Sequence, residues 1–212
     1  MTRTLPDLPW KFDDLFSLPD VKRYEIIAGQ LFELSTPGTD HATAVVNLLY
    51  LLHPEVTKLD GLILLGPLGV FMRDADPVLP DTMVLLPDRQ HFMTNRGIEG
   101  PPNLLVEILC AANPAHDRLR KRALYARAGV REYWIASPEA ATIAVLTLDG
   151  DDYTLLVRAG GDEPIKSQLF PDLMFPVSDV FGLMPPQAAS NQPVSPGTPY
   201  PGAADGFSAR VR

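Results

Sequence analysis

A glutamate inside an apolar segment is the residue of this chain that most clearly points to chemistry. Residues 104–110 read Leu-Leu-Val-Glu-Ile-Leu-Cys, a run typical of a fully covered central strand, and Glu107 lies in its middle. An ionised carboxylate rarely goes inside a protein without a compensating cation or hydrogen-bond donors. We therefore expect a cation beside Glu107, either a metal ion shared with Asp81 or the ammonium group of Lys121. An ion pair with an arginine of the following helix is the structural alternative.

Asp81 is the second carboxylate of interest. It ends the sequence Val-Leu-Pro-Asp, just ahead of the apolar run 82–86, so it would start a strand able to pair with the Glu107 strand. Two carboxylates a few Å apart repel each other and raise one pKa unless a cation holds them. Mg²⁺ or Mn²⁺ suits such a pair, because these ions bind carboxylates, waters and phosphate oxygens. An aspartate after a proline is equally typical of a turn.

Lys121 lies in a basic segment of an acidic chain. Residues 117–131 hold six basic residues against one acidic residue, although the net charge of the chain is −8. The segment is either a solvated helix face or an edge that faces phosphate groups. Asp117 and Lys121 are four residues apart, the spacing of a site pair but also of an ordinary surface ion pair. In the phosphate-facing interpretation the contacts would come from three arginines, Arg118, Arg120 and Arg122.

Composition indicates one ordinary globular domain. The chain has 212 residues, of which 46% are hydrophobic and 21% charged. The longest apolar stretch, 42–52, is far shorter than the roughly 18 residues that a membrane span needs, and the first residues lack an apolar signal core. We therefore expect a cytoplasmic protein without membrane contact. The negative net charge argues against a protein that coats nucleic acid by bulk electrostatics.

Hydrophobic patterning predicts an α/β fold with a mixed sheet. Ahead of the Glu107 strand we expect a hairpin, a helix that ends before Pro54, two strands and a structureless loop, over 23–35, 42–52, 62–72, 82–86 and 87–102. After it we expect a helix from Asp117 that ends at Gly129, a strand and a hairpin, the last two over 132–136, 142–148 and 153–158. The inward residues of that helix would be Leu119, Ala123, Leu124 and Ala126. We assign residues 1–184 to the folded domain and 185–212, rich in proline and glycine, to a disordered tail.

Two carboxylates and five longer segments carry a family resemblance. Asp81 followed about 25 residues later by Glu107, in the strand order above, resembles the PD-(D/E)XK nuclease superfamily. More specific segments are Tyr24–Leu31, Leu79–Asp81, Gly100–Leu109, Asp117–Tyr125 and Gly129–Ile135. They look like the Uma-two family of restriction endonucleases, and the similarity runs from about residue 10 to residue 183. The resemblance implies a restriction-endonuclease-like mixed sheet flanked by helices, with an added N-terminal hairpin.

The resemblance also implies a site. The superfamily usually has a lysine two residues after the glutamate; this chain has Leu109 there, and the family match places the lysine at Lys121. Mg²⁺ or Mn²⁺ would be held by Asp81, Glu107 and the backbone carbonyl of Ile108. Two further residues match family positions, Glu25 and His41. Glu25 could face the metal or form a salt bridge within the hairpin, and a lone histidine such as His41 is more often structural.

Three functions are compatible with these residues. The first is a metal-dependent endonuclease that hydrolyses DNA phosphodiester bonds, in which Lys121 orients the attacking water and Asp117 positions Lys121. The second is an inactive module of the nuclease fold that binds nucleic acid or a protein. It is favoured by the acidic net charge and by Asn103, which stands where the family usually has an acid. The third is an enzyme acting on small phosphate esters. A homodimer is expected by analogy with other restriction-like nucleases.

Overall fold

The computed structural model describes most of the region predicted to fold. Described are residues 10, 11, 14, 18, 23–27, 29–34, 36–72, 77–110 and 115–182, without the side chains of residues 23, 27, 34 and 115–118. The predicted tail, 185–212, lies outside the described residues. Among the described residues, no helix is long and apolar enough to cross a membrane.

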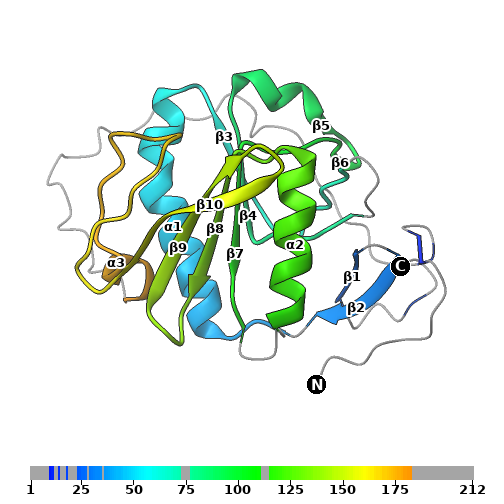
Figure 1. Ribbon diagram of the computed structural model, residues 1–212, viewed down its shortest axis with the longest axis horizontal. Helices are drawn as coiled ribbons and strands as arrows, with labels where there is room; N and C mark the ends of the chain where they lie inside the picture. The colour runs from blue at the N-terminus through cyan, green and yellow to red at the C-terminus, as the bar shows by residue number, and fades with distance from the viewer. Residues whose placement is uncertain are drawn as a thin grey trace, which may run out of the picture.

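A six-stranded mixed sheet forms the centre of the molecule (Figure 1). Its strand order is β10-β9-β8-β7-β4-β3. The strands are β3 (Leu62–Leu65), β4 (Thr82–Leu85), β7 (Leu104–Ile108), β8 (Glu132–Ser137), β9 (Thr142–Asp149) and β10 (Asp152–Gly160). Strand β7 runs parallel to β8 and antiparallel to β4, so the sheet is mixed, as predicted.

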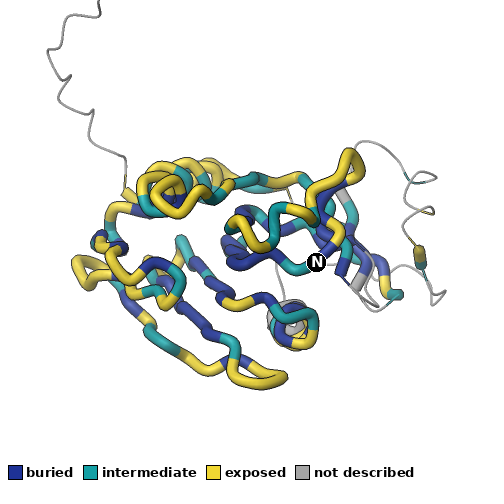
Figure 2. The backbone as a smooth tube through the Cα atoms, turned by 90° about the horizontal axis from the view of Figure 1, so that it is seen from above, coloured by how far each residue is buried: buried dark blue, intermediate teal, exposed yellow. Residues whose placement is uncertain are grey.

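Two long helices cover opposite faces of this sheet (Figure 1). Helix α1 (Thr39–Lys58) packs Leu48 and Leu52 against one face, together with Val106 of β7. Helix α2 (Ala115–Ala128) packs Leu124 and Tyr125 against the other face, together with Leu105 of β7. Because side chains alternate along a strand, β7 is covered on both sides. In Figure 2 buried stretches run along the central strands, and exposed stretches lie in turns, on outer helix faces and along the edge strand β10.

Both predicted hairpins are present. The N-terminal one pairs β1 (Arg23–Ile27) with β2 (Gln30–Leu34) in a two-stranded sheet of its own. Its turn contains Gly29 at φ 73°, a conformation that glycine adopts without steric cost. The second hairpin pairs β9 with β10. The chain then runs through residues 161–177 to the short helix α3 (Ser178–Phe181), whose Val180 packs beside α1.

Four expectations about the elements were wrong in part. Helix α1 continues through Pro54 to Lys58. The proline is exposed, and the added turn buries Val56 completely. Burying a valine contributes about 1.5–3 kcal/mol, which offsets much of the roughly 3 kcal/mol cost of an interior proline. Strand β3 ends at Leu65 instead of residue 72, because the Gly66-Pro67 segment interrupts the ladder.

The region predicted as a structureless loop, 87–102, is folded. It contains the 3₁₀ helix η2 (Pro87–Phe92) and a small hairpin of β5 (Met93–Thr94) and β6 (Gly97–Ile98). Ile98 is fully buried in the core on the α2 side of the sheet. The burial of this one apolar side chain, with Phe92 packed beside it, gives the segment a core contact that its polar composition hides.

The inward face of α2 was also predicted wrongly in part. Leu124 and Ala126 are buried, but Leu119 is 65% exposed and Ala123 is exposed too. The buried face instead includes Lys121, which is 5% exposed. Hydrophobic periodicity counts a lysine as an outward residue, so it set the wrong phase for this helix.

Candidate functional site

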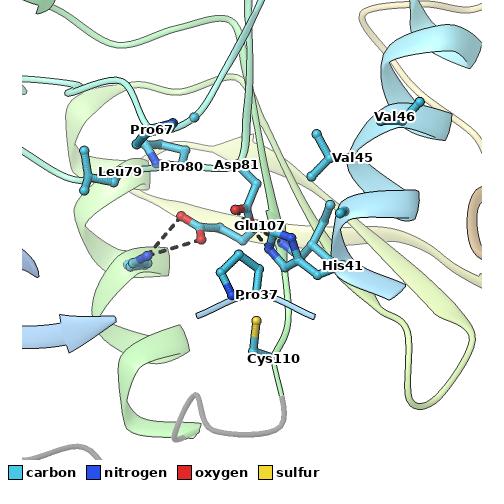
Figure 3. Close-up of a pocket in the computed structure, with 14 residues that line it drawn as sticks. Pro37, His41, Val45, Val46, Pro67, Leu79, Pro80, Asp81, Glu107 and Cys110 are labelled. Atoms are coloured by element: carbon cyan, nitrogen blue, oxygen red, sulfur yellow. Dashed lines mark hydrogen bonds and ion pairs between the residues drawn. The ribbon is translucent and has the colours of Figure 1, made fainter. Parts of the chain in front are cut away.

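The register between two neighbouring strands brings the predicted carboxylates together. Thr82 of β4 pairs with Val106 of β7 in an antiparallel ladder, so the residue before Thr82 lies opposite the residue after Val106. Those two residues are Asp81 and Glu107. Both line a pocket of about 300 Å³ that lies between the start of α1, the end of β3 and the C-terminal end of β7 (Figure 3).

The pocket is lined by apolar residues and by four ionisable side chains. Its fourteen lining residues include Asp81, Glu107, Lys121 and His41. The other described lining residues are Pro37, Ala42, Val45, Val46, Gly66, Pro67, Leu79, Pro80, Ile108 and Cys110. The sequence prediction therefore placed Asp81, Glu107, Ile108 and Lys121 in one site, and the structure brings these four together.

The carboxylate of Asp81 is held at both oxygens. Its Oδ2 accepts a hydrogen bond of 2.7 Å from the backbone N–H of Ile108, and its Oδ1 lies 3.1 Å from His41 Nε2. The backbone beside it is fixed by Gly66, whose N–H donates to the Asp81 carbonyl at 3.0 Å. A Cβ atom on Gly66 would stand 2.7 Å from the Pro80 carbonyl oxygen, so this close approach requires glycine. Asp81 is thus a fixed side chain of the pocket.

Glu107 is held by two residues of α2. Each carboxylate oxygen lies 3.2 Å from Lys121 Nζ, and Oε1 also accepts a hydrogen bond of 2.6 Å from the Tyr125 hydroxyl. Burial raises the pKa of Glu107 to about 7; the positive charge of Lys121 and the Tyr125 hydrogen bond oppose this rise, while Asp81 and Glu25 add to it. At neutral pH the carboxyl group is therefore poised between its two protonation states.

Lys121 lies between two carboxylates. Its Nζ is 3.0 Å from Glu25 Oε1, in addition to the contact with Glu107. The side chain of Glu25 is fully buried, and Glu25 does not line the pocket. The cation expected beside Glu107 is therefore Lys121 in this structure. The alternative pairing of Glu107 with a helix arginine is absent among the described residues, where each Glu107 ion pair and hydrogen bond involves Lys121 or Tyr125.

The three arginines predicted to contact phosphate groups have different surroundings. Arg120 Nη1 donates to Gln30 Oε1 at 2.6 Å, and the guanidinium lies 5.5 Å from the Phe32 ring centre. Arg122 forms a salt bridge with Asp152 and donates to the Tyr153 carbonyl, so it ties α2 to β10. The side chains of Asp117 and Arg118 lie outside the described residues. A phosphate contact by any of the three arginines stays a prediction.

The sequence analysis gave no site role to Tyr125, and it left His41 as a lone histidine. Tyr125 follows Lys121 by four residues, so the two share one helix face, and this spacing was a usable signal. The contact of His41 with Asp81 joins the first turn of α1 to the start of β4, forty residues later. Such a contact depends on how α1 packs across the sheet, which local patterning does not encode.

Asn103 proves unrelated to the pocket. It precedes β7, four residues from Glu107 and thus about 13 Å away along the strand. Its side chain accepts a hydrogen bond from the Leu86 N–H at 2.8 Å and donates to Asp88 Oδ1 at 3.1 Å. An acid at this position would face the Asp88 carboxylate. The asparagine at this position is explained by its hydrogen bond to Asp88, so it is no longer an argument for an inactive site.

The donor set of the pocket fits a hard divalent cation. Two carboxylates, from Asp81 and Glu107, and the backbone of Ile108 lie at one sheet edge. Mg²⁺ and Mn²⁺ commonly take one or two protein carboxylates and complete their shell with water and phosphate oxygens. Within the described residues no group of three or more His, Cys, Asp or Glu side chains could hold a metal by itself. Two carboxylates and one backbone carbonyl would leave coordination positions for water or substrate oxygens, and a metal ion in this pocket stays a prediction.

Comparison with known proteins places this geometry in a family. No curated protein matches the chain. A crystal structure titled as that of "a putative nuclease belonging to DUF820", from Anabaena variabilis ATCC 29413, superposes with a TM-score of 0.67 at 18% identity. The match covers 82% of this chain and 98% of that chain, and it establishes a shared fold. Residues 11–178 match the model of the Uma2 family, described as "Putative restriction endonuclease". This match spans most of the sequence, so the chain belongs to the Uma2 family, and its membership supports a nuclease function.

Proposed function

We propose that the protein is a metal-dependent endonuclease that hydrolyses DNA phosphodiester bonds. One observation carries the proposal: the carboxylates of Asp81 and Glu107 face one pocket from adjacent strands, with Lys121 Nζ 3.2 Å from Glu107. Two carboxylates alone would repel a phosphodiester. A divalent cation between them and the substrate turns the same residues into a phosphate site.

Asp81, Glu107 and the carbonyl of Ile108 would hold the Mg²⁺ or Mn²⁺ ion. The bound ion would supply a water of lowered pKa and offset charge on the non-bridging phosphate oxygens. Asp81 is prepared for this task, because His41 and the Ile108 N–H fix the direction of its carboxylate. Tyr125 does the same for Glu107 through its hydroxyl group. Fixed ligands lower the cost of ordering the site when substrate binds.

Lys121 would orient the attacking water and stabilise the transition state. Its ammonium group has three N–H donors on a flexible stem, and the pocket is where that group is exposed to a ligand. Positive charge at this position stabilises the additional negative charge that develops at phosphorus during hydrolysis. Arg118 and Arg120 on the same helix would add contacts to the DNA backbone, which give affinity without sequence reading.

The second candidate function is a nuclease-fold module that binds nucleic acid or a protein without cleaving. Lys121 already pairs with Glu107 and Glu25, so part of the buried negative charge is compensated without a metal ion. The net charge of −8 also opposes tight binding of DNA by the surface as a whole. This candidate predicts salt-dependent DNA binding with no cleavage product.

Plasmid cleavage with Mg²⁺ or Mn²⁺ tests the first candidate. Asp81→Asn and Lys121→Met should lower the rate of nicking and linearisation at least about a hundredfold while the proteins remain folded by circular dichroism. Glu139→Gln is the matched control, because Glu139 is an exposed acid in the turn after β8. Loss of activity in the two site variants but not in the control supports the nuclease. Equal activity in all four proteins would reveal a contaminant, and DNA binding without products in the parent would favour the second candidate. Sedimentation in the same buffers measures whether the protein is a dimer.

A further inference from the structure

The N-terminal hairpin places the buried carboxylate of Glu25 beside the site, although the hairpin is not part of the central sheet. Strands β1 and β2 pair only with each other among the described strands. Yet Glu25, in the middle of β1, has no exposed surface and contacts the ammonium group of Lys121. A fully buried carboxylate is costly unless it is paired, so this contact calls for an explanation.

The hairpin holds two consecutive residues of α2. Glu25 meets Lys121 at 3.0 Å, while Gln30 accepts a hydrogen bond from Arg120 at 2.6 Å and the Phe32 ring lies under the same arginine. Glu25 and Phe32 are cross-strand partners, so their side chains share one face of the hairpin. That face is the one that meets α2. The hairpin is thus fixed against the part of the helix that carries the lysine.

Glu25 contacts Lys121 without being part of the pocket wall. Lys121, Glu107 and Asp81 line the pocket, whereas Glu25 does not. Glu25 is instead in contact with the pocket residue Lys121. The geometry therefore gives Glu25 a different task from that of Asp81 and Glu107.

We propose that Glu25 is a positioning residue that fixes Lys121 and is not a metal ligand, so that the docked hairpin completes the site. This proposal rests on the proposed nuclease function. A lysine has a flexible four-carbon stem, and one carboxylate partner leaves its ammonium group free to swing about that partner. A second carboxylate, on a separate element, limits the ammonium group to one position between Glu25 and Glu107. Fixed placement of a charged group is what transition-state stabilisation requires.

Glu25→Gln tests the proposal, because it keeps the size of the side chain and removes its charge. We expect kcat for plasmid cleavage to fall at least about tenfold, with KM for DNA and the affinity for Mn²⁺ changed less than about twofold. In the Lys121→Met background the same substitution should have no further effect on kcat, because Glu25 acts through Lys121. Asp81→Asn is the comparison for a metal ligand and should lose Mn²⁺ binding. Glu33→Gln is the matched control, since Glu33 lies on the same hairpin but points to the face opposite Phe32.

Two results would overturn the proposal. A loss of Mn²⁺ affinity in Glu25→Gln as large as in Asp81→Asn would make Glu25 a ligand. An undiminished effect of Glu25→Gln in the Lys121→Met background would separate it from the lysine. If Glu25→Gln does not fold, Gln30→Ala serves instead, because it removes the exposed contact with Arg120 and leaves the buried pair in place. It should lower kcat without weakening Mn²⁺ binding, and an unchanged kcat would count against the role of the hairpin.

The failure of the nuclease function can be told apart from the failure of this inference. If the parent protein cleaves no DNA, nuclear magnetic resonance of protein labelled with ¹⁵N-lysine still reports on Lys121. Its Nζ signal, assigned by its loss in Lys121→Met, should shift in Glu25→Gln and stay in place in Glu33→Gln. An unmoved signal in Glu25→Gln would refute the positioning role of Glu25 whether or not the protein is a nuclease.

Discussion

Replacing Glu107 by glutamine should change how the stability of the protein depends on pH. The pKa of Glu107 is raised from 4.5 to about 7, chiefly by burial. The folded protein therefore binds this proton more tightly than the unfolded chain does. Between pH 4.5 and pH 7 the folded state holds more protons at this site, so its stability falls as the pH rises.

The size of the effect follows from that difference in pKa. At about 1.4 kcal/mol for each tenfold change in proton affinity, Glu107 should cost the parent about 3 kcal/mol of unfolding free energy at pH 8 relative to pH 4. Glutamine has no proton to release, so Glu107→Gln should lack this part of the pH dependence.

Urea unfolding of both proteins at several pH values measures the difference. We expect the stability of the parent relative to Glu107→Gln to decrease steadily from pH 5 to pH 8. Saturating Mg²⁺ should flatten the curve of the parent, because a cation competes with the proton for the carboxylate. A difference that does not vary with pH, or that grows in favour of the parent as the pH rises, would show that Glu107 is ionised throughout. The burial argument for this site would then be refuted.

Three further predictions concern residues around the site. Tyr125→Phe removes the hydrogen bond to Glu107, so the free energy of unfolding should fall by about 1.5–3 kcal/mol, as measured by thermal melts. Tyr153→Phe is the control, because it removes a buried hydroxyl that donates to a neutral backbone carbonyl. Glu132→Gln disturbs a buried carboxylate that accepts hydrogen bonds from Trp134, Ser167, Gln168 and Leu169, so it should cost about 2 kcal/mol or more in urea unfolding without changing Mn²⁺ affinity. Asn103→Asp sets a second carboxylate against Asp88 and should destabilise the fold by about 1–2 kcal/mol, while kcat of the folded enzyme is unchanged; a lowered kcat would return Asn103 to the site.

The sequence predicted the parts of the site that strand patterning controls. Glu107 was identified because a single charge interrupts an apolar run, and Asp81 because it starts the neighbouring strand. Their meeting follows from the antiparallel pairing of β4 with β7, in which Thr82 lies opposite Val106. Lys121 was one of two candidate cations for Glu107, and the family resemblance gave it the catalytic role, since hydrophobic periodicity alone would have placed it on the outer face of α2.

The sequence could not predict contacts between elements that are far apart in the chain. The approach of His41 to Asp81 and of Glu25 to Lys121 depends on how α1 and the hairpin pack, and neither contact has a local signature. The same holds for the folded segment 87–102, whose core contacts come from Ile98 and Phe92 among several exposed neighbours. The continuation of α1 beyond Pro54 was missed for a related reason, because only the packed core reveals that Val56 has a buried position to fill.

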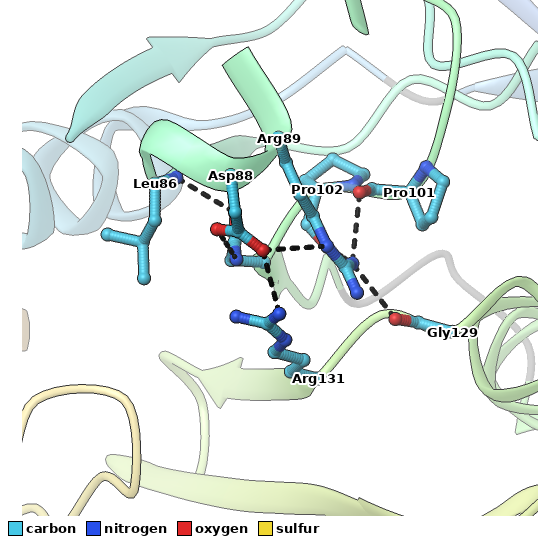
Figure 4. Close-up of polar contacts among 8 residues, drawn as sticks. Leu86, Asp88, Arg89, Pro101, Pro102, Gly129 and Arg131 are labelled. Atoms are coloured by element: carbon cyan, nitrogen blue, oxygen red, sulfur yellow. Dashed lines mark hydrogen bonds and ion pairs between the residues drawn. The ribbon is translucent and has the colours of Figure 1, made fainter. Parts of the chain in front are cut away.

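The position of Lys121 relative to Glu107 depends on α2 keeping a fixed place against β7, and the opposite end of the molecule supplies this restraint. Arg89 donates to the carbonyls of Pro101 and Pro102, at the entry to β7, and to that of Gly129, at the end of α2 (Figure 4). One guanidinium group thus joins the start of the glutamate strand to the end of the lysine helix. Placing the lysine on a helix instead of on the strand makes such a restraint necessary, since covalent spacing no longer fixes its distance from the glutamate. The arginine at one end and the hairpin at the other together replace that lost constraint.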